Sequence, residues 1–104
     1  LPALLAAGVA VGLGTDGCAS NNDLDLLGEM DTCAKLHKVA ALDPTVASAA
    51  EVLSLATSLG GQAFGQPGLG VLAKGSPADI IVYQGGLAEG LAPVHHAMAN
   101  GHGR

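Results

Sequence analysis

The sequence is short of aromatic, basic and cysteine residues, and each shortage narrows the protein class. None of its 104 residues is Trp, one is Tyr and one is Phe, so the apolar 49 % is mainly Ala, Leu and Val. That composition suits helices packed on a parallel sheet, in one small domain with a modest core. Only four Lys and Arg residues are present and the net charge is −5. This argues against a nucleic-acid partner, because phosphate binding needs clustered cations.

The cysteines and the apolar runs bear on cellular location. Cys18 and Cys33 are 15 residues apart and form no CxxC motif, which favours reduced thiols in the cytoplasm over a disulfide. The longest apolar run, residues 3–13, is too short and too broken by glycine to cross a bilayer, and it lacks the charged start of a signal peptide. No membrane partner is therefore expected. The chain opens on Leu1 rather than Met, which suggests a piece of a longer protein.

The most informative stretch is VAVGLGTDGCASNNDLD, residues 9–25. Residues 8–13 form an apolar run typical of a strand buried on both faces. The run ends in Gly-Thr-Asp-Gly, where two glycines allow a sharp turn and leave Asp16 projecting. Ser20 and Asp23 then have capping-box spacing ahead of an apolar-periodic segment. The order strand, acidic loop and helix predicts an α/β fold with a carboxylate where β/α barrels carry their active sites.

Further along, two helices and a return to extended structure are expected. Residues 24–40 have helical apolar periodicity, and Asp31 with Lys35 forms a favourable i,i+4 pair. Ser48 and Glu51 form a full capping box, which predicts a second helix over about residues 49–60, ended by a Gly-Gly pair. From residue 69 the pattern becomes extended, with a strong β run at its end, residues 80–83.

The pattern around Asp16 leaves two other interpretations open. Gly12, Gly14 and Gly17 match the GxGxxG spacing of a dinucleotide-binding loop. Against this, Asp16 lies inside the loop and would repel a pyrophosphate, and the expected helix begins several residues too late. In the other alternative the chain is a non-catalytic interaction fragment, and Asp16 is a turn or capping aspartate, the common role of Thr-Asp-Gly alone.

The strings Gly-Leu-Gly-Thr-Asp-Gly (residues 12–17) and Ser-Asn-Asn-Asp-Leu-Asp (residues 20–25) resemble the amidohydrolase superfamily. The similarity is to its ATZ/TRZ-like aminohydrolase branch of deaminases and chlorohydrolases, above all the 5-methylthioadenosine/S-adenosylhomocysteine deaminases. It extends over about residues 4–93. The resemblance implies the C-terminal part of a metal-dependent hydrolase TIM (β/α)8 barrel. Residues 1–65 would hold the last barrel strand with its helices, and residues 66–104 part of a return β-sandwich with a frayed tail.

The resemblance also implies a site and a reaction. Asp16 would be both a metal ligand and the catalytic proton carrier. The metal would be divalent, Zn²⁺ first and Fe²⁺ second, with a His-x-His pair, two further histidines and a glutamate supplied upstream of Leu1. The implied enzyme is a hydrolase of non-peptide carbon–nitrogen bonds that deaminates a purine nucleoside such as methylthioadenosine or S-adenosylhomocysteine. Guanine-type and chlorotriazine substrates, and a homo-oligomeric parent, stay open. The isolated chain is expected to be inactive.

Overall fold

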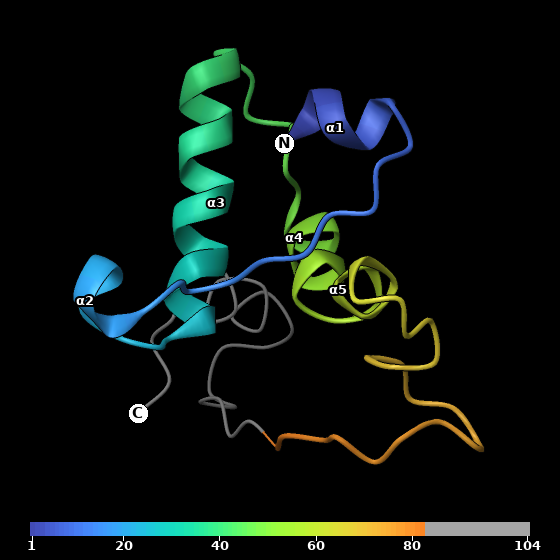
Figure 1. Ribbon diagram of the computed structural model, residues 1–104. Helices are drawn as coiled ribbons and strands as arrows, with labels where there is room; N and C mark the ends of the chain where they lie inside the picture. The colour runs from blue at the N-terminus through green and yellow to red at the C-terminus, as the bar shows by residue number, and fades with distance from the viewer. Residues whose placement is uncertain (83–104) are drawn as a thin grey trace, which may run out of the picture.

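The computed structural model describes residues 1–82, in which helices supply all of the regular secondary structure (Figure 1). α3 stands beside α4 and α5, and the segment of residues 9–17 runs across this group toward α2 (Figure 1). No helix formed by residues 1–82 is long and apolar enough to cross a membrane. The five helices of this region are α1 (Pro2–Ala6), α2 (Cys18–Asn21), α3 (Leu26–Ala41), α4 (Ala49–Ala56) and α5 (Ser58–Ala63).

α1 ends through a local glycine motif. Gly8 adopts a left-handed conformation, with φ of 73°, which a residue without a Cβ adopts at little cost. Its N–H donates to the Leu5 carbonyl at 2.9 Å, and the Val9 N–H donates to the Leu4 carbonyl at 3.0 Å. These two bonds are those of a Schellman motif, which satisfies the last carbonyls of a helix. The chain therefore leaves α1 in a fixed direction, as an extended segment.

The strand predicted over residues 8–13 does not form. Gly8 belongs to the turn that ends α1, and residues 9–17 have no regular secondary structure. A buried parallel strand takes its ladder hydrogen bonds from neighbouring strands, and residues 1–82 contain no strand that could supply them. The β run predicted over residues 80–83 is likewise absent from residues 80–82, and Tyr83 lies outside the described residues.

The start of α3 differs from the predicted capping box. Ser20 lies within α2, which ends at Asn22 in a left-handed conformation, so Ser20 does not cap the long helix. Asp25 takes that place, and its carboxylate accepts from the Leu27 N–H at 2.9 Å. Asp23 instead supports the connection, because its carboxylate accepts from the Asp25 N–H at 3.2 Å. The predicted helix is confirmed within two residues at each end, with a different cap.

One exposed ion pair on α3 was predicted from its spacing and is present. Lys35 Nζ lies 2.6 Å from Asp31 Oδ2. Such an i,i+4 pair stabilises a helix by roughly 0.2–0.5 kcal/mol.

The capping box of α4 is confirmed. The Ser48 hydroxyl accepts from the Glu51 N–H at 3.3 Å, and Glu51 Oε2 accepts from the Ser48 N–H at 2.8 Å. The bonds from the Ser48 backbone and hydroxyl lower the pKa of the Glu51 carboxyl. The predicted Gly-Gly stop is wrong, since Gly60 and Gly61 lie within α5, and the break falls earlier, at Thr57.

These two glycines serve close packing. A Cβ at Gly60 would lie 2.9 Å from the Leu55 carbonyl oxygen. One at Gly61 would lie 2.6 Å from the Leu69 carbonyl oxygen.

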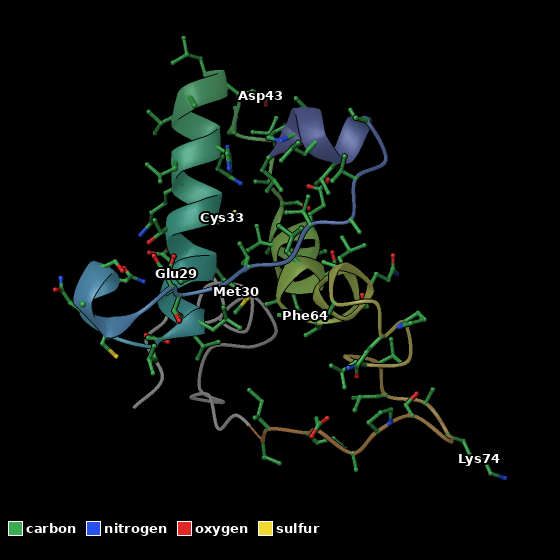
Figure 2. All side chains as sticks on the ribbon, in the orientation of Figure 1. Glu29, Met30, Cys33, Asp43, Phe64 and Lys74 are labelled. Carbon is green, nitrogen blue, oxygen red and sulfur yellow. The ribbon has the colours of Figure 1, made fainter. Side chains whose placement is uncertain are left out.

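A small core joins α3 to α4. Met30 lies on the side of α3 that faces α4 (Figure 2). The core residues come from both helices and from the loop between them: Met30, Ala34, Ala47 and Val52. That loop is fixed by Lys38, whose Nζ donates to the Val46 and Ala47 carbonyls, each at 2.7 Å. Leu55 is the one large side chain of residues 1–82 that is wholly buried.

The small core leaves much apolar surface uncovered, and we expect the isolated chain to associate. Large apolar side chains left exposed to water favour protein association. Size-exclusion chromatography with light scattering should therefore show aggregates or a loosely folded chain. A monodisperse monomer with a sharp, cooperative thermal transition would contradict this prediction. The most exposed large apolar side chains are Val82 (95 %), Leu42 (90 %), Leu72 (87 %), Ile81 (84 %) and Phe64 (81 %).

Candidate functional site

Asp16 lies on an exposed turn between the extended segment and α2. Its backbone is left-handed, with φ of 58°, a conformation that is uncommon outside glycine and that Asp tolerates better than most residues. The Thr15 hydroxyl donates to the Asp16 carbonyl at 3.1 Å. Gly17 follows as the N-cap of α2. The Asp16 side chain is exposed, as predicted, but the turn is made differently, because Asp16 itself has the positive φ and neither Gly14 nor Gly17 does.

A backbone contact fixes the chain just before this turn. The Leu13 N–H donates to the Leu55 carbonyl at 3.2 Å, where α4 nears its end. The segment also passes very close to α5, because a Cβ built on Gly12 would lie 3.1 Å from the Gly60 Cα. Only glycine fits this approach without a shift of the neighbouring backbone. Gly12 thus allows the segment of residues 9–13 to pack closely on α5. This packing explains the glycine without a bound phosphate.

A side-chain contact fixes the chain just after the turn. Asn21, at the end of α2, donates through Nδ2 to Glu29 Oε1 on α3, at 2.6 Å. Both side chains are partly buried. The sequence analysis missed this pair, since a separation of eight residues across a helix break carries no recognisable pattern.

The Asp16 carboxylate itself is free. Within residues 1–82 it forms neither a side-chain hydrogen bond nor a salt bridge. The same part of the chain contains no group of three or more His, Cys, Asp or Glu side chains that could hold a metal ion. His37 is partly buried on α3, and the other three histidines lie outside the described residues. Residues 1–82 therefore do not form a complete metal centre, and Asp16 could supply only one carboxylate ligand to such a site.

The two cysteines are free, as predicted. Cys18 is exposed at the start of α2. Cys33 is half-buried and packs against the core, and this burial raises the pKa of its thiol. A raised pKa lowers the thiolate fraction and with it the reactivity of the sulfur. Cys33 thus has a packing role.

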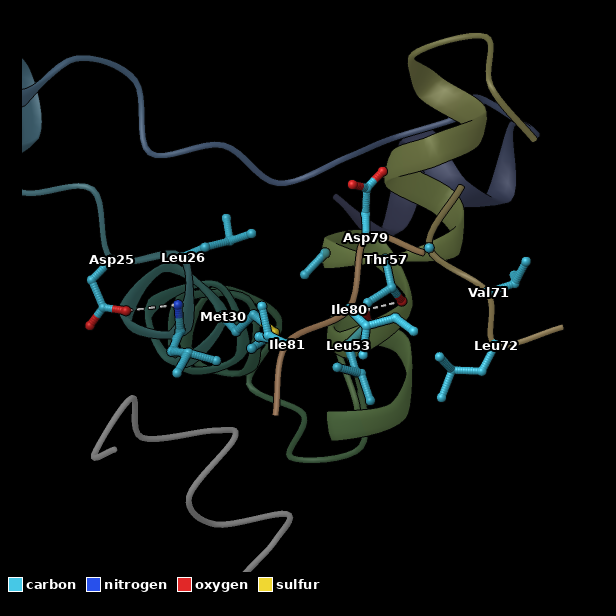
Figure 3. Close-up of a pocket in the computed structure, with 13 residues that line it drawn as sticks. Asp25, Leu26, Met30, Leu53, Thr57, Val71, Leu72, Asp79, Ile80 and Ile81 are labelled. Carbon is cyan, nitrogen blue, oxygen red and sulfur yellow. Dashed lines mark hydrogen bonds between the residues drawn. The ribbon is translucent and has the colours of Figure 1, made fainter. Parts of the chain in front are cut away.

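Away from Asp16, a hollow with a volume of about 420 Å³ lies between α3, α4 and the segment of residues 70–81 (Figure 3). Two carboxylates, those of Asp25 and Asp79, line the hollow. The Asp25 carboxylate accepts a hydrogen bond from the Leu27 N–H, and that of Asp79 forms no hydrogen bond within residues 1–82. The hollow therefore lacks the paired polar groups that catalysis requires. Its walls are mostly apolar, from Leu26, Leu27, Met30, Leu53, Ala56, Val71, Leu72, Ile80 and Ile81.

Comparison with known families and proteins gives consistent matches. The family model described as the amidohydrolase family matches residues 1–102. The chain is 61 % identical over 83 residues to a 5-methylthioadenosine/S-adenosylhomocysteine deaminase from Syntrophobacter fumaroxidans, which covers 79 % of the chain and 19 % of the relative. It is 41 % identical over 100 residues to a 5'-deoxyadenosine deaminase from Methanopyrus kandleri. This match covers 96 % of the chain and 23 % of the relative. The chain thus spans about a fifth of the length of these relatives.

A solved structure is also similar. It is an adenosine deaminase from Xanthomonas campestris with bound zinc, and it shares 48 % sequence identity with the chain at a TM-score of 0.62. The superposition covers 65 % of this chain and 16 % of that one.

Proposed function

Since the chain belongs to the amidohydrolase family, we propose that it is the C-terminal portion of a metal-dependent aminohydrolase. The longer polypeptide, called the parent enzyme below, would hydrolytically deaminate a purine nucleoside such as methylthioadenosine or S-adenosylhomocysteine. The observation that carries the proposal is the Asp16 carboxylate, which has no side-chain partner within residues 1–82 and stands on a turn anchored on both sides. The names of the two deaminase relatives support the substrate class.

The proposal extends to architecture. In the parent enzyme residues 9–13 would pair with neighbouring strands as the last strand of a TIM-type barrel, with residues 1–65 completing that part of the barrel. Residues 66–104 would belong to the β-sandwich beside it. The similarity to the zinc-containing deaminase structure supports such a fold. We place the parent enzyme in the cytoplasm, in keeping with the free thiols of Cys18 and Cys33.

Asp16 fits one place in a metal site. Its carboxylate is exposed, has no partner within residues 1–82, and stands on a turn fixed by backbone and side-chain contacts. Carboxylate oxygen is an accepted ligand of Zn²⁺, and Fe²⁺ is the alternative metal. When bound, the metal would supply Lewis-acid activation of water. The remaining ligands would come from other parts of the parent enzyme.

The chemical role proposed for Asp16 is proton transfer. Hydrolysis replaces the exocyclic amino group of the base by oxygen and releases ammonia. Asp16 would accept one proton from the attacking water and return it to the departing nitrogen, so that the carboxylate is regenerated in each turnover. Within residues 1–82 no Lys or Arg side chain forms a salt bridge with Asp16, so its carboxylate is open to the attacking water.

The dinucleotide-loop interpretation gains nothing from the geometry. The helix after Gly17 has four residues, and the long helix begins only at Leu26. A pyrophosphate-binding loop leads directly into a helix N-terminus and carries no carboxylate at its tip. In the other alternative the chain is a non-catalytic interaction fragment and Asp16 is only a turn residue. The activity assay below distinguishes this alternative from the proposed enzyme.

The test is ammonia release by the zinc-loaded parent enzyme. Methylthioadenosine, S-adenosylhomocysteine and 5'-deoxyadenosine are expected to release ammonia. Guanine, followed by ammonia release, and a chlorotriazine, followed by chloride release, are the comparison substrates. Turnover of the adenosine-type compounds alone would support the proposed substrate class. Turnover of guanine alone would support an aminohydrolase with a different substrate. Turnover of the chlorotriazine alone, seen as chloride release, would replace the proposed deaminase by a chlorohydrolase. No hydrolysis of any of them would overturn the proposed function.

A further inference from the structure

We infer that the hydrogen bond between Asn21 and Glu29 sets the position of the Asp16 carboxylate, so that these two are positioning residues of the proposed site. The inference rests on the proposed function, because it assigns to Asp16 the proton transfer described above. The 2.6 Å bond is the observation that carries it.

Among residues 1–82, α2 has little else to hold it in place. It is four residues long and contains no buried residue, so apolar packing does not fix its orientation. Helices of this length are not stable by themselves. Glu29, in contrast, belongs to a helix of 16 residues and directly precedes Met30, which is 3 % exposed in the core. The bond from Asn21 thus ties a weakly held helix to a firmly held one.

The bond is also of a strong kind. One partner is a carboxylate, the contact is short, and both groups are partly buried. Charge-assisted hydrogen bonds are shorter and stronger than neutral ones, and partial burial reduces competition by water. The alternative contacts of α2 are backbone bonds within its own turns, which do not orient it relative to α3.

The position of α2 is transmitted directly to Asp16. The Ser20 and Asn21 N–H groups both donate to the Gly17 carbonyl, at 2.9 and 3.0 Å. Gly17 is bonded to Asp16, whose left-handed φ of 58° is less favourable than the right-handed and extended regions and therefore depends on the contacts that hold the turn on either side. A rotation of α2 would therefore move Gly17 and swing the Asp16 side chain. With Leu13 held on the other side, the turn is fixed at both ends.

The experiment changes the bond in the parent enzyme. N21D sets a carboxylate against Glu29 and should break the contact by repulsion, and N21A removes the donor without adding charge. Both are expected to lower kcat for methylthioadenosine about 10- to 100-fold, the usual effect of removing a group that orients a ligand. KM should stay within about threefold. Zinc content per chain and hydrogen–deuterium exchange of residues 14–21 provide readouts independent of activity.

The double variant N21D/E29Q is the decisive rescue. It exchanges donor and acceptor, since the new amide can donate to the new carboxylate, and it leaves the net charge of the parent unchanged. We expect kcat to return to within about threefold of the value of the unmutated enzyme. Hydrogen–deuterium exchange of residues 14–21 should slow again. K35M is the matched control, because it breaks an exposed pair on the same helix α3 and should leave kcat and exchange unchanged.

The outcomes separate this inference from the proposed function. Loss of kcat in N21A and N21D with recovery in the double variant supports positioning. If N21A lowers only the melting temperature and keeps the kcat of the unmutated enzyme, the positioning role is overturned while the proposed function stands. Loss of kcat without recovery in the double variant also overturns it. A parent enzyme that releases no ammonia overturns the proposed function, and the inference with it.

Discussion

Asp16→Asn is expected to lower kcat of the parent enzyme by about 10²–10⁴-fold, the usual contribution of a general base. Asn has the same shape and can still offer an oxygen to a metal, but it cannot take a proton from water. The fold should persist, because the Asp16 side chain is exposed and has no partner within residues 1–82. The measurement is ammonia release from methylthioadenosine, with the zinc content of each preparation determined alongside.

Asp23→Asn is the matched control for this prediction. Asp23 is exposed in the connection between α2 and α3, where its carboxylate accepts one hydrogen bond, from the Asp25 N–H. An amide oxygen can accept the same bond, so the change should cost less than about 1 kcal/mol of stability and no turnover. If Asp16→Asn kept near-parental turnover, the catalytic assignment would be wrong and Asp16 would be a turn residue only.

Leu55→Ala should be the most destabilising truncation within the described part of the chain. Leu55 is 0 % exposed, and replacing a buried Leu by Ala costs about 2–5 kcal/mol, according to how far the cavity collapses. Its carbonyl also holds the Leu13 N–H, so relaxation around the cavity would loosen the segment that leads to Asp16. Urea denaturation of the parent enzyme measures the change in the free energy of unfolding.

Thr32→Ala provides the comparison for Leu55→Ala. Thr32 is exposed on α3, and surface changes of this kind alter stability by about 0.5 kcal/mol or less. Equal losses from the two variants would show that Leu55 is not part of the core.

Several local features were predictable because each depends on residues close together in the sequence. The turn at Gly8 that ends α1 needs only two hydrogen bonds, within the six residues from Leu4 to Val9. The capping box of Ser48 and Glu51, and the i,i+4 pair of Asp31 and Lys35, are likewise complete within one helical turn. Such interactions form whenever the local backbone is helical, and so their sequence patterns are reliable.

Other local patterns were overridden by contacts that the patterns themselves do not reveal. Ser20 and Asp23 have capping-box spacing, yet α2 takes up Ser20 and Asp25 caps the long helix. Gly60 and Gly61 look like a helix stop, but they lie in α5, where a Cβ would meet the Leu55 or Leu69 carbonyl. Glycine permits both a turn and a close approach, and only the packed structure distinguishes them.

The candidate site divides in the same way. The sequence by itself determined that one carboxylate, Asp16, stands between Gly14 and Gly17 after an apolar run. It did not determine whether that run becomes a strand, because a strand exists only with a partner to bond to. Tertiary structure alone decided that Leu13 is held by Leu55 and Asn21 by Glu29. These contacts join residues whose spacing follows no helical or strand period, so only the folded chain brings them together.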